Sequence, residues 1–467
     1  MKIFRKNTIK KVAISHVATI ILFSTCFGGP QMNKVDPLPN HTIFGIDPYP
    51  PATEGREKGH WVGSFHVSPY YQDAPGSRNA AGDKVAIGAE YGAWNTAGIF
   101  YGVSKAVDDS YEANVLPDLT WTGSKPAASG ENYEKFKAAL ELLDTKYTDT
   151  TDTNFDPANV NHGTHTVDVS YQRLGVRGEI RIALFEGADL TVRAGACEYR
   201  MTPTIFTPHA DADDDVKKYL LEEFKLDEIM SELGLSLDRV HDVVLEDTYV
   251  RLSGGFPLLL KDENDNDVVT FAPSVAVGVW LPTGKKVDHD KAFSISSGND
   301  GHTGVCVEGA INLDFHETIL ASAGGGLTYF NDKTYDNFRT PNHMFQNGIY
   351  PWRTKIKRDP GYSWFAHASM RALRFMNETS FYLDYSYSAH QADTITCEDS
   401  SAARAALFTD GTKLLQERSV WNCQELHCGI MYEASPNLEM GLSFHAHVGG
   451  QITYRTKTIT GSVRFLF

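Results

Sequence analysis

Apolar and polar residues alternate along the last segment of the chain with a period of two. Ile459, Val463 and Phe467 share one parity with glycine and other apolar residues, whereas Thr456 and Arg464 belong to the opposite, polar parity. In a β-strand, residues of one parity lie on one face. A strand with one apolar and one polar face suits the wall of a closed barrel that has lipid outside and water inside. The pattern therefore predicts a strand that faces lipid.

The same alternation recurs through much of the chain. In the C-terminal half, the clearest segments are 305–315, 319–330, 364–370, 381–387, 426–432 and 438–448. Toward the N-terminus, we assign further strands at 61–71, 85–94, 165–172, 176–184 and 190–196, with two more between 244 and 281. The predicted fold class is all-β, an antiparallel transmembrane β-barrel of about 12–14 strands, because bacterial barrels have an even number of strands.

Connection lengths supply an independent indication. Short connections near Glu317, Asn377 and Ser435 separate long polar ones. Outer-membrane barrels have short periplasmic turns and long extracellular loops, so this alternation favours a barrel over a sandwich. The long connections, which we expect on the extracellular side, cover residues 282–303, 331–360 and 391–422. Counting strands backwards from the C-terminus places the long stretch 103–161 in the periplasm, so one strand assignment near it is wrong.

The first 29 residues are typical of a secretory signal peptide, with a basic start and a short apolar run from Val12 to Phe23. That run is too short to cross a bilayer as a helix. Cys26 suggests lipidation, although Phe23 and Thr25 depart from the usual lipoprotein signal. We therefore expect export, with lipidation at Cys26 left open.

The remainder of the chain is assigned to two parts. Residues 30–60 are polar and rich in proline, and residues 61–467 are assigned to a single barrel domain. Apolar residues recur with helical spacing inside two stretches, near 104–161 and 200–243. These are expected to be small helical inserts in loops.

Charge narrows the range of partners. The 467 residues carry a formal net charge of −16, which disfavours nucleic acid as a partner. The expected partners are outer-membrane lipid and small polar solutes. No cofactor is expected, because the chain has no P-loop and no dinucleotide-binding fingerprint.

Charged residues on the polar parity are the candidate pore-lining residues. Opposed guanidinium and carboxylate groups in a barrel can set a field that selects polar solutes, or they can simply pair with one another. The set is Arg177, Glu179, Arg181, Arg193, Glu308, Asp314, Arg371, Asp384, Glu425, His427, Glu439, His445, His447 and Arg464.

Cysteines and catalytic motifs add little. Cys397 and Cys423 flank one long polar loop and either form a disulfide or remain thiols. No zinc-type spacing is present, so no metal site is expected. The chain also lacks the Gly-x-Ser-x-Gly motif of serine hydrolases, and we expect no enzyme activity.

Two segments resemble a known group of proteins. Leu245-Glu246-Asp247-Thr248-Tyr249 and the strand that closes on Leu281-Pro282-Thr283-Gly284 are similar to outer-membrane channels of the phenol-degradation and fatty-acid-transporter type. The terminal Phe467 resembles the closing aromatic of bacterial outer-membrane barrels. The resemblance implies an outer-membrane location, and it implies recognition of the C-terminal strand by the barrel-assembly machinery.

Three functions remain compatible with the sequence. The first is an outer-membrane channel for diffusion of small solutes, which the export signal, the alternating strands and the charged inner face favour. The second is a surface scaffold or adhesin that binds partners through its loops. The third is a secreted soluble β protein, in which the same alternation describes a sandwich.

Overall fold

A computed structural model of the chain describes residues 63–95, 164–185, 187–208, 234–261, 267–315, 318–341, 348, 350, 352–398, 405 and 408–467. The expected signal peptide, the proline-rich segment 30–60 and Cys26 lie outside these residues. The helical periodicities within 104–161 and 209–233 lie outside them too.

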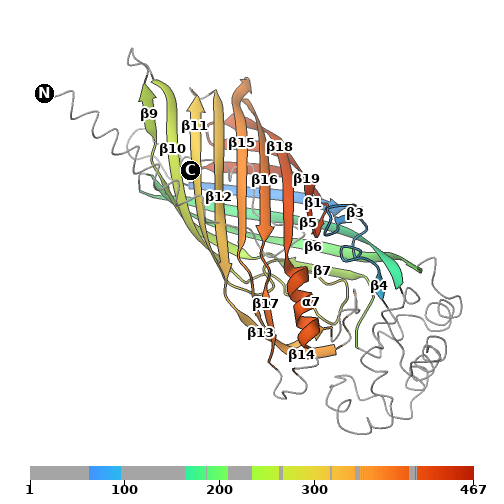
Figure 1. Cartoon of the computed structure of the whole chain (residues 1–467). Helices are drawn as coiled ribbons and strands as arrows, with labels where there is room; N and C mark the ends of the chain where they lie inside the picture. Colours follow the sequence, from blue (N-terminus) through green and yellow to red (C-terminus); the bar gives the residue numbers. More distant parts are fainter. Residues whose placement is uncertain are drawn as a thin grey trace, which may run out of the picture.

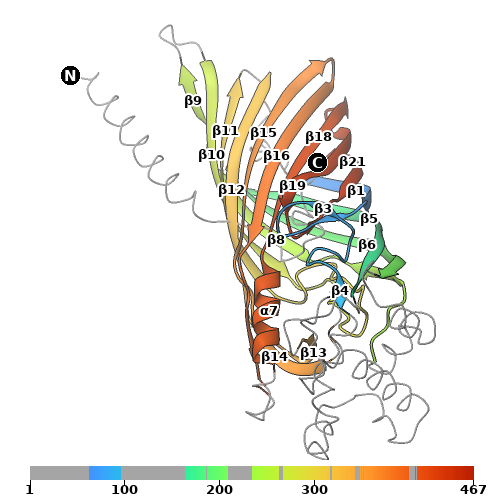
Figure 2. The same cartoon turned by 45° about the vertical axis from the view of Figure 1, so that its right-hand side comes forward.

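Twelve antiparallel strands form a closed barrel wall. Figures 1 and 2 show how these strands run side by side around the wall. Around the wall the order is β5-β1-β21-β19-β18-β16-β15-β12-β11-β10-β8-β6, and pairing of β6 with β5 closes it. In chain order, the wall strands are β1 (Gly63–Ala74), β5 (Thr164–Phe185), β6 (Ala188–Pro208), β8 (Thr248–Gly255), β10 (Asp267–Leu281), β11 (Gly304–Phe315), β12 (Ile319–Phe330), β15 (Ser363–Met376), β16 (Thr379–His390), β18 (Trp421–Ser435), β19 (Leu438–Gln451) and β21 (Lys457–Leu466).

The first and the last strand of the barrel are neighbours in the wall. Strand β21 pairs with β1 in a register that places Phe465 opposite Phe65. Beyond it, the backbones of Gly63 and Phe467 exchange hydrogen bonds of 3.0 and 2.9 Å. The backbone N–H of Leu466 also donates to Asn437 O in the short turn between β18 and β19. The C-terminus therefore lies at the end of the barrel that carries the short turns.

The alternation predicted for the last strand is confirmed. Ile459 and Phe465 are 51% and 47% exposed on the outside of the wall, whereas Thr458 and Ser462 are buried inside it. Other wall strands follow the same rule, so the outside of the barrel is apolar. Among the described residues, no helix is long and apolar enough to cross a membrane.

Two strand assignments were wrong. The segments 165–172 and 176–184 belong to one long strand, β5, because Arg173 and Gly175 continue the ladder between them. The segment 85–94 is not a wall strand: it contributes only to β3 (Lys84–Val85) and β4 (Trp94–Asn95). Joining the two halves of β5 moves the connection between β1 and β5 to the end that holds the other long connections.

The long connections carry small elements of their own beyond the barrel wall (Figures 1 and 2). One three-stranded sheet joins connections that are separate in sequence, and helix α7 (Thr409–Ser419) packs against it. The strands of this sheet are β13 (Lys333–Thr340), β14 (Trp352–Asp359) and β17 (Thr394–Cys397). Short strands elsewhere include β2 (Ser77–Arg78), β7 (Val240–Leu245), β9 (Leu258–Lys261) and β20 (Thr453–Tyr454). Of the range 200–243 in which an insert is expected, both ends belong to strands, because β6 extends to Pro208 and β7 begins at Val240.

Candidate functional site

The candidate pore-lining residues all occupy the polar face of their strands, opposite the exposed apolar face. Several are fully buried in the wall interior, including Glu179, Asp384 and His427. Others, such as Arg193 and Glu308, keep side chains that are 14% and 21% exposed. The full set is Arg177, Glu179, Arg181, Arg193, Glu308, Asp314, Arg371, Asp384, Glu425, His427, Glu439, His445, His447 and Arg464.

A buried carboxylate, Glu246, is the centre of one cluster. Its Oε1 accepts hydrogen bonds from Tyr70 Oη at 2.7 Å and from Arg173, and its Oε2 accepts one from Arg177 Nε at 2.8 Å. The Arg177 guanidinium also stacks over the Tyr70 ring, 4.2 Å from its centroid. Gly195 faces this cluster because any Cβ at that position would lie 2.2 Å from Glu246 Oε2. The two cations and the hydroxyl compensate the buried negative charge.

Further ion pairs continue along the same side of the lumen. Arg193 Nε donates to Glu179 Oε2 at 2.5 Å, which joins β6 to β5. Arg251 Nε donates to Glu308 Oε2 at 2.9 Å, and Glu308 Oε1 accepts a bond of 2.6 Å from the Tyr249 hydroxyl. Further pairs of this kind are Arg181 with Asp189 and Arg464 with Glu439. Arginine and carboxylate therefore face each other in a ladder over β5, β6, β8 and β11, with one more pair between β19 and β21.

Sequence analysis missed several members of this ladder. Arg173 falls between two predicted strands, although it shares the parity of Arg177. Arg251 and Glu246 lie in the range 244–281, where the sequence predicts two strands but not which residues face inward. Asp189 sits at the start of β6, next to its turn. Extending the alternation by whole strands would have found Arg173.

The opposite wall is rich in histidine. Asp384 on β16 pairs in register with His427 on β18, which in turn pairs with His445 on β19. The rings of His427 and His445 stack with centroids 4.2 Å apart. His367 on β15 brings its Nδ1 within 3.4 Å of Asp384 Oδ2. Imidazole and carboxylate groups thus cross four adjacent strands.

The sequence left open whether Cys397 and Cys423 form a disulfide or remain thiols, and in the structure both remain thiols. Cys397 lies at the end of β17, where its Sγ is 3.4 Å from Thr354 Oγ1. Cys423 lies on the inner face of β18, where its Sγ is 3.9 Å from His447 Nδ1. The two cysteines belong to different sheets, so closeness to the same loop in sequence does not bring their sulfurs together.

The two segments that resemble known channels contact each other. Glu246 and Asp247 interrupt the strand between β7 and β8, and Thr283 Oγ1 donates to Glu246 O at 2.8 Å. Asp247 accepts backbone bonds from Gly284 at 2.8 Å and from Asn299 at 2.6 Å. The acidic pair therefore ties the Leu-Pro-Thr-Gly turn and the following loop to the rim of the barrel.

A second polar network lies outside the barrel, among the long connections. Arg358 on β14 donates to Asp393 Oδ2 at 2.6 Å and approaches Asp300 Oδ2 at 3.4 Å. Burial opposes the charge of Asp393, but the Arg358 guanidinium and the bond from His390 outweigh it and hold the pKa of that carboxyl well below its usual range. Burial, with Arg358 adding to it, lowers the pKa of His302 to about 4. This network holds the three-stranded sheet of β13, β14 and β17, which we call the outer sheet, against the loop 282–303.

The outer surface of the wall decides where this barrel resides. Apolar side chains such as Leu174, Val277 and Leu442 are more than half exposed there, while charged side chains point inward. A barrel in water has the reverse arrangement, whereas lipid favours an apolar outside. The protein is a transmembrane β-barrel. Its 12 strands agree with the even number of strands in bacterial barrels.

Comparisons with known proteins find similar structures only. No family model and no curated protein matches the chain. An outer-membrane channel from Pseudomonas putida F1 is 11% identical over 88% of this chain and 98% of its own, with a TM-score of 0.46. The transport unit of the autotransporter AIDA-I from Escherichia coli is 8% identical over 88% and 92%, with a TM-score of 0.33. The CymD monoaromatic hydrocarbon channel is 8% identical over 65% of this chain and 77% of its own, with a TM-score of 0.28.

Proposed function

We propose that the barrel is a channel for diffusion of small polar solutes across the outer membrane. The observation that carries the proposal is the inner wall, where opposed charges keep contact with solvent. Arg177, Arg193 and Glu308 point inward with side chains 12%, 14% and 21% exposed. A wall built only to be filled by its own side chains has no need for solvent contact at these charges.

The size of the barrel supports the same proposal. Eight strands enclose an interior that side chains can fill, and 16 or more leave an aqueous channel. With 12 strands, the interior is wider than the first class. The ladder of arginine and carboxylate provides fixed charges of both signs along it, which favours polar over apolar solutes.

Conductance of the full chain in a planar lipid bilayer tests the proposal. Protein that has been folded in detergent, and that shows heat-modifiable gel migration, should insert and produce discrete current steps. Folded protein that never conducts would refute the channel, because the heat-dependent shift shows that the barrel itself is closed.

A charge variant refines the test. Glu308→Gln leaves Arg251 without its carboxylate in the lumen, so the reversal potential in a KCl gradient should shift toward anions. Glu198→Gln is the matched control, since Glu198 forms an exposed ion pair with Arg200. Equal shifts in both variants would mean that the effect does not arise in the lumen.

The outer sheet favours a second candidate, a scaffold that binds partners at the cell surface. Strands β13, β14 and β17 with helix α7 form an ordered unit outside the wall, where a partner can reach it. Replacing residues 332–361 by a short turn distinguishes the two functions. A scaffold loses partner binding, whereas a channel keeps its conductance.

A further inference from the structure

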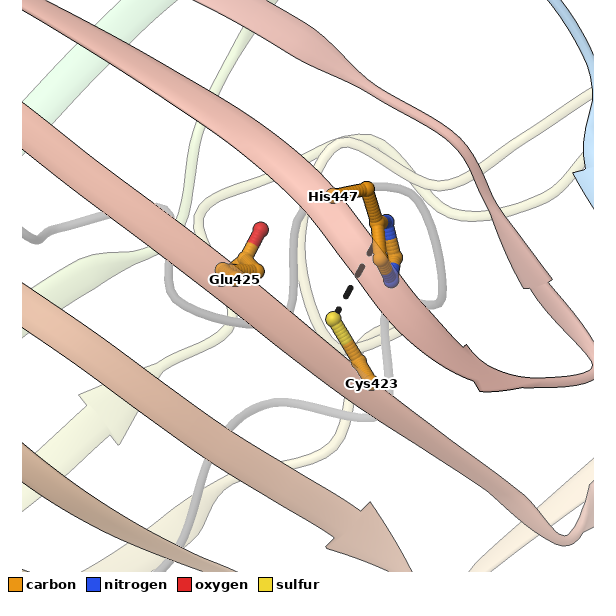
Figure 3. Close-up of side chains that lie close together, drawn as sticks. All are labelled: Cys423, Glu425 and His447. Carbon is orange, nitrogen blue, oxygen red and sulfur yellow. Dashed lines mark hydrogen bonds between the residues drawn. The ribbon is translucent and has the colours of Figure 1, made fainter.

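Three side chains with metal-ligating groups converge on the inner wall between β18 and β19. Cys423 and Glu425 are two residues apart on β18 and therefore share its inner face. His447 on β19 pairs with Glu425 in the register of the two strands. Figure 3 shows the three side chains gathered between the neighbouring strands, with the contact between Cys423 and His447 drawn as a dashed line.

The distances suit one small ion. One ligand atom from each of the three residues lies within 4.8 Å of the others, and Cys423 Sγ is 3.9 Å from His447 Nδ1. A tetrahedral angle between a Zn–S bond of about 2.3 Å and a Zn–N bond of about 2.0 Å places sulfur and nitrogen about 3.5 Å apart. A movement of a few tenths of an ångström closes that difference.

The surroundings hold the ligands in place. Cys423 is fully buried and Glu425 is nearly so, so their rotamers are confined by the wall. The second ring nitrogen of His447, Nε2, lies 3.5 Å from Thr453 Oγ1. A hydroxyl at that nitrogen orients the ring and leaves Nδ1 directed at the cluster, which is the usual role of an outer partner of a metal-bound histidine.

The chemistry of the three groups selects the ion. Thiolate and imidazole are preferred by zinc, whereas magnesium and calcium take oxygen ligands. A site with three protein ligands also leaves a fourth position for water or for a passing solute. We propose that Cys423, Glu425 and His447 bind one Zn²⁺ ion on the lumen wall. This site is independent of whether the barrel conducts.

Metal titration of the full-length protein tests the site. The protein is folded in detergent, its heat-modifiable migration is verified, and Zn²⁺ is titrated in competition with a chromophoric chelator. We expect one ion per chain at this site. Co²⁺ serves as a second probe, because a cysteine thiolate bound to Co²⁺ gives a charge-transfer absorption band in the near ultraviolet that carboxylates and imidazoles do not give.

Matched variants assign the site to these residues. Cys423→Ser and His447→Gln should each weaken Zn²⁺ binding more than tenfold. Loss of a group that only hydrogen-bonds to a metal ligand already lowers metal affinity by about 10–100-fold. Cys423→Ser should also abolish the Co²⁺ charge-transfer band. The control is Cys428→Ser, which removes a cysteine from the same strand on its other face and should bind like the wild type.

Two outcomes would overturn the proposal. In the first, wild-type protein binds Zn²⁺ no more tightly than folded Cys423→Ser protein. In the second, Co²⁺ binds without a thiolate band, which places the ion at other groups of the chain. Glu425→Gln guards against a folding artefact, because it keeps the size of the side chain and should weaken binding while the heat-dependent shift is unchanged.

Discussion

Tyr70 on β1 donates its hydroxyl hydrogen to Glu246 Oε1 over 2.7 Å, although the two residues are 176 positions apart in the sequence. The bond reaches across β5 and β6 to the interruption between β7 and β8. Arg177 lies against both residues, over the Tyr70 ring and bonded to Glu246. The cluster therefore links β1, the first strand of the barrel, to the junction between β7 and β8, which lies on the far side of the β5–β6 pair.

Removing the charge of Glu246 should destabilise the barrel. Glu246→Gln leaves Arg173 and Arg177 buried without their carboxylate, and breaking a buried ion pair in this way costs about 3–5 kcal/mol. Urea-induced unfolding in detergent, followed by the heat-modifiable band or by tryptophan fluorescence, measures the free energy of unfolding.

An exposed ion pair is the control for that variant. Arg200 is 57% exposed and pairs with Glu198, so Arg200→Gln should change the free energy of unfolding by less than about 1 kcal/mol. If both variants lose equally little, Glu246 is not a structural centre of the wall.

Gly175 on β5 should not tolerate a side chain. A Cβ at this position would lie 2.6 Å from Tyr70 Oη, so Gly175→Ala must displace the ring and strain its bond to Glu246. Overpacking of this kind costs about 1–3 kcal/mol. Gly178→Ala on the same strand is the control, because the nearest atom to its Cβ is 4.0 Å away. Comparison of the two urea midpoints checks the prediction, and equal midpoints would contradict it.

The outer face should reject charge according to depth. Leu442 lies within β19 and is 53% exposed to lipid, whereas Val448 lies near the end of the same strand. An arginine on the lipid face costs about 2–4 kcal/mol near the bilayer midplane and about 0–1 kcal/mol near its edges. Leu442→Arg should therefore reduce folding into lipid vesicles far more than Val448→Arg. A larger loss for Val448→Arg would place the membrane elsewhere along the strand.

Acid should loosen the outer sheet from the barrel. His302 has a pKa of about 4 in the folded protein, below its ordinary value of 6.5, so only the undocked state takes up a proton between these pH values. Docking is then fully stable above pH 6.5, weakens as the pH falls toward 4, and changes no further through this group below that. The loss amounts to at most about 3 kcal/mol.

Hydrogen exchange of β13 and β14, corrected for the intrinsic pH dependence of exchange, measures this effect. His302 Nδ1 donates to Asn331 O, 2.7 Å away, and Nε2 is 2.9 Å from the Tyr335 hydroxyl. His302→Gln should reduce the pH dependence of protection. His289 nearby also has a lowered pKa because of burial, so part of the dependence should remain. An unchanged profile in the variant would exclude His302 as its source.

Sequence alone determined most strands of the barrel wall and the direction of their side chains. Alternation in β21 and β19 identifies the lipid face because each strand face meets a single solvent over its whole length. The charges of Arg177, Arg193 and Glu308 could be assigned to the inside for the same reason. Where alternation is interrupted, as at Arg173 and at Glu246, residues that belong to the inner wall were missed.

Only the tertiary structure decided which side chains meet. The partner of Glu246 on β1, and the approach of His447 to Cys423, depend on the register between strands and on the bulge at Gln424 and Glu425. A period of two assigns each residue to a face, but it does not fix how far one strand is shifted along its neighbour. The barrel could therefore be predicted from the sequence, whereas the ion-pair ladder and the proposed zinc site depend on the closed wall and on the register of its strands.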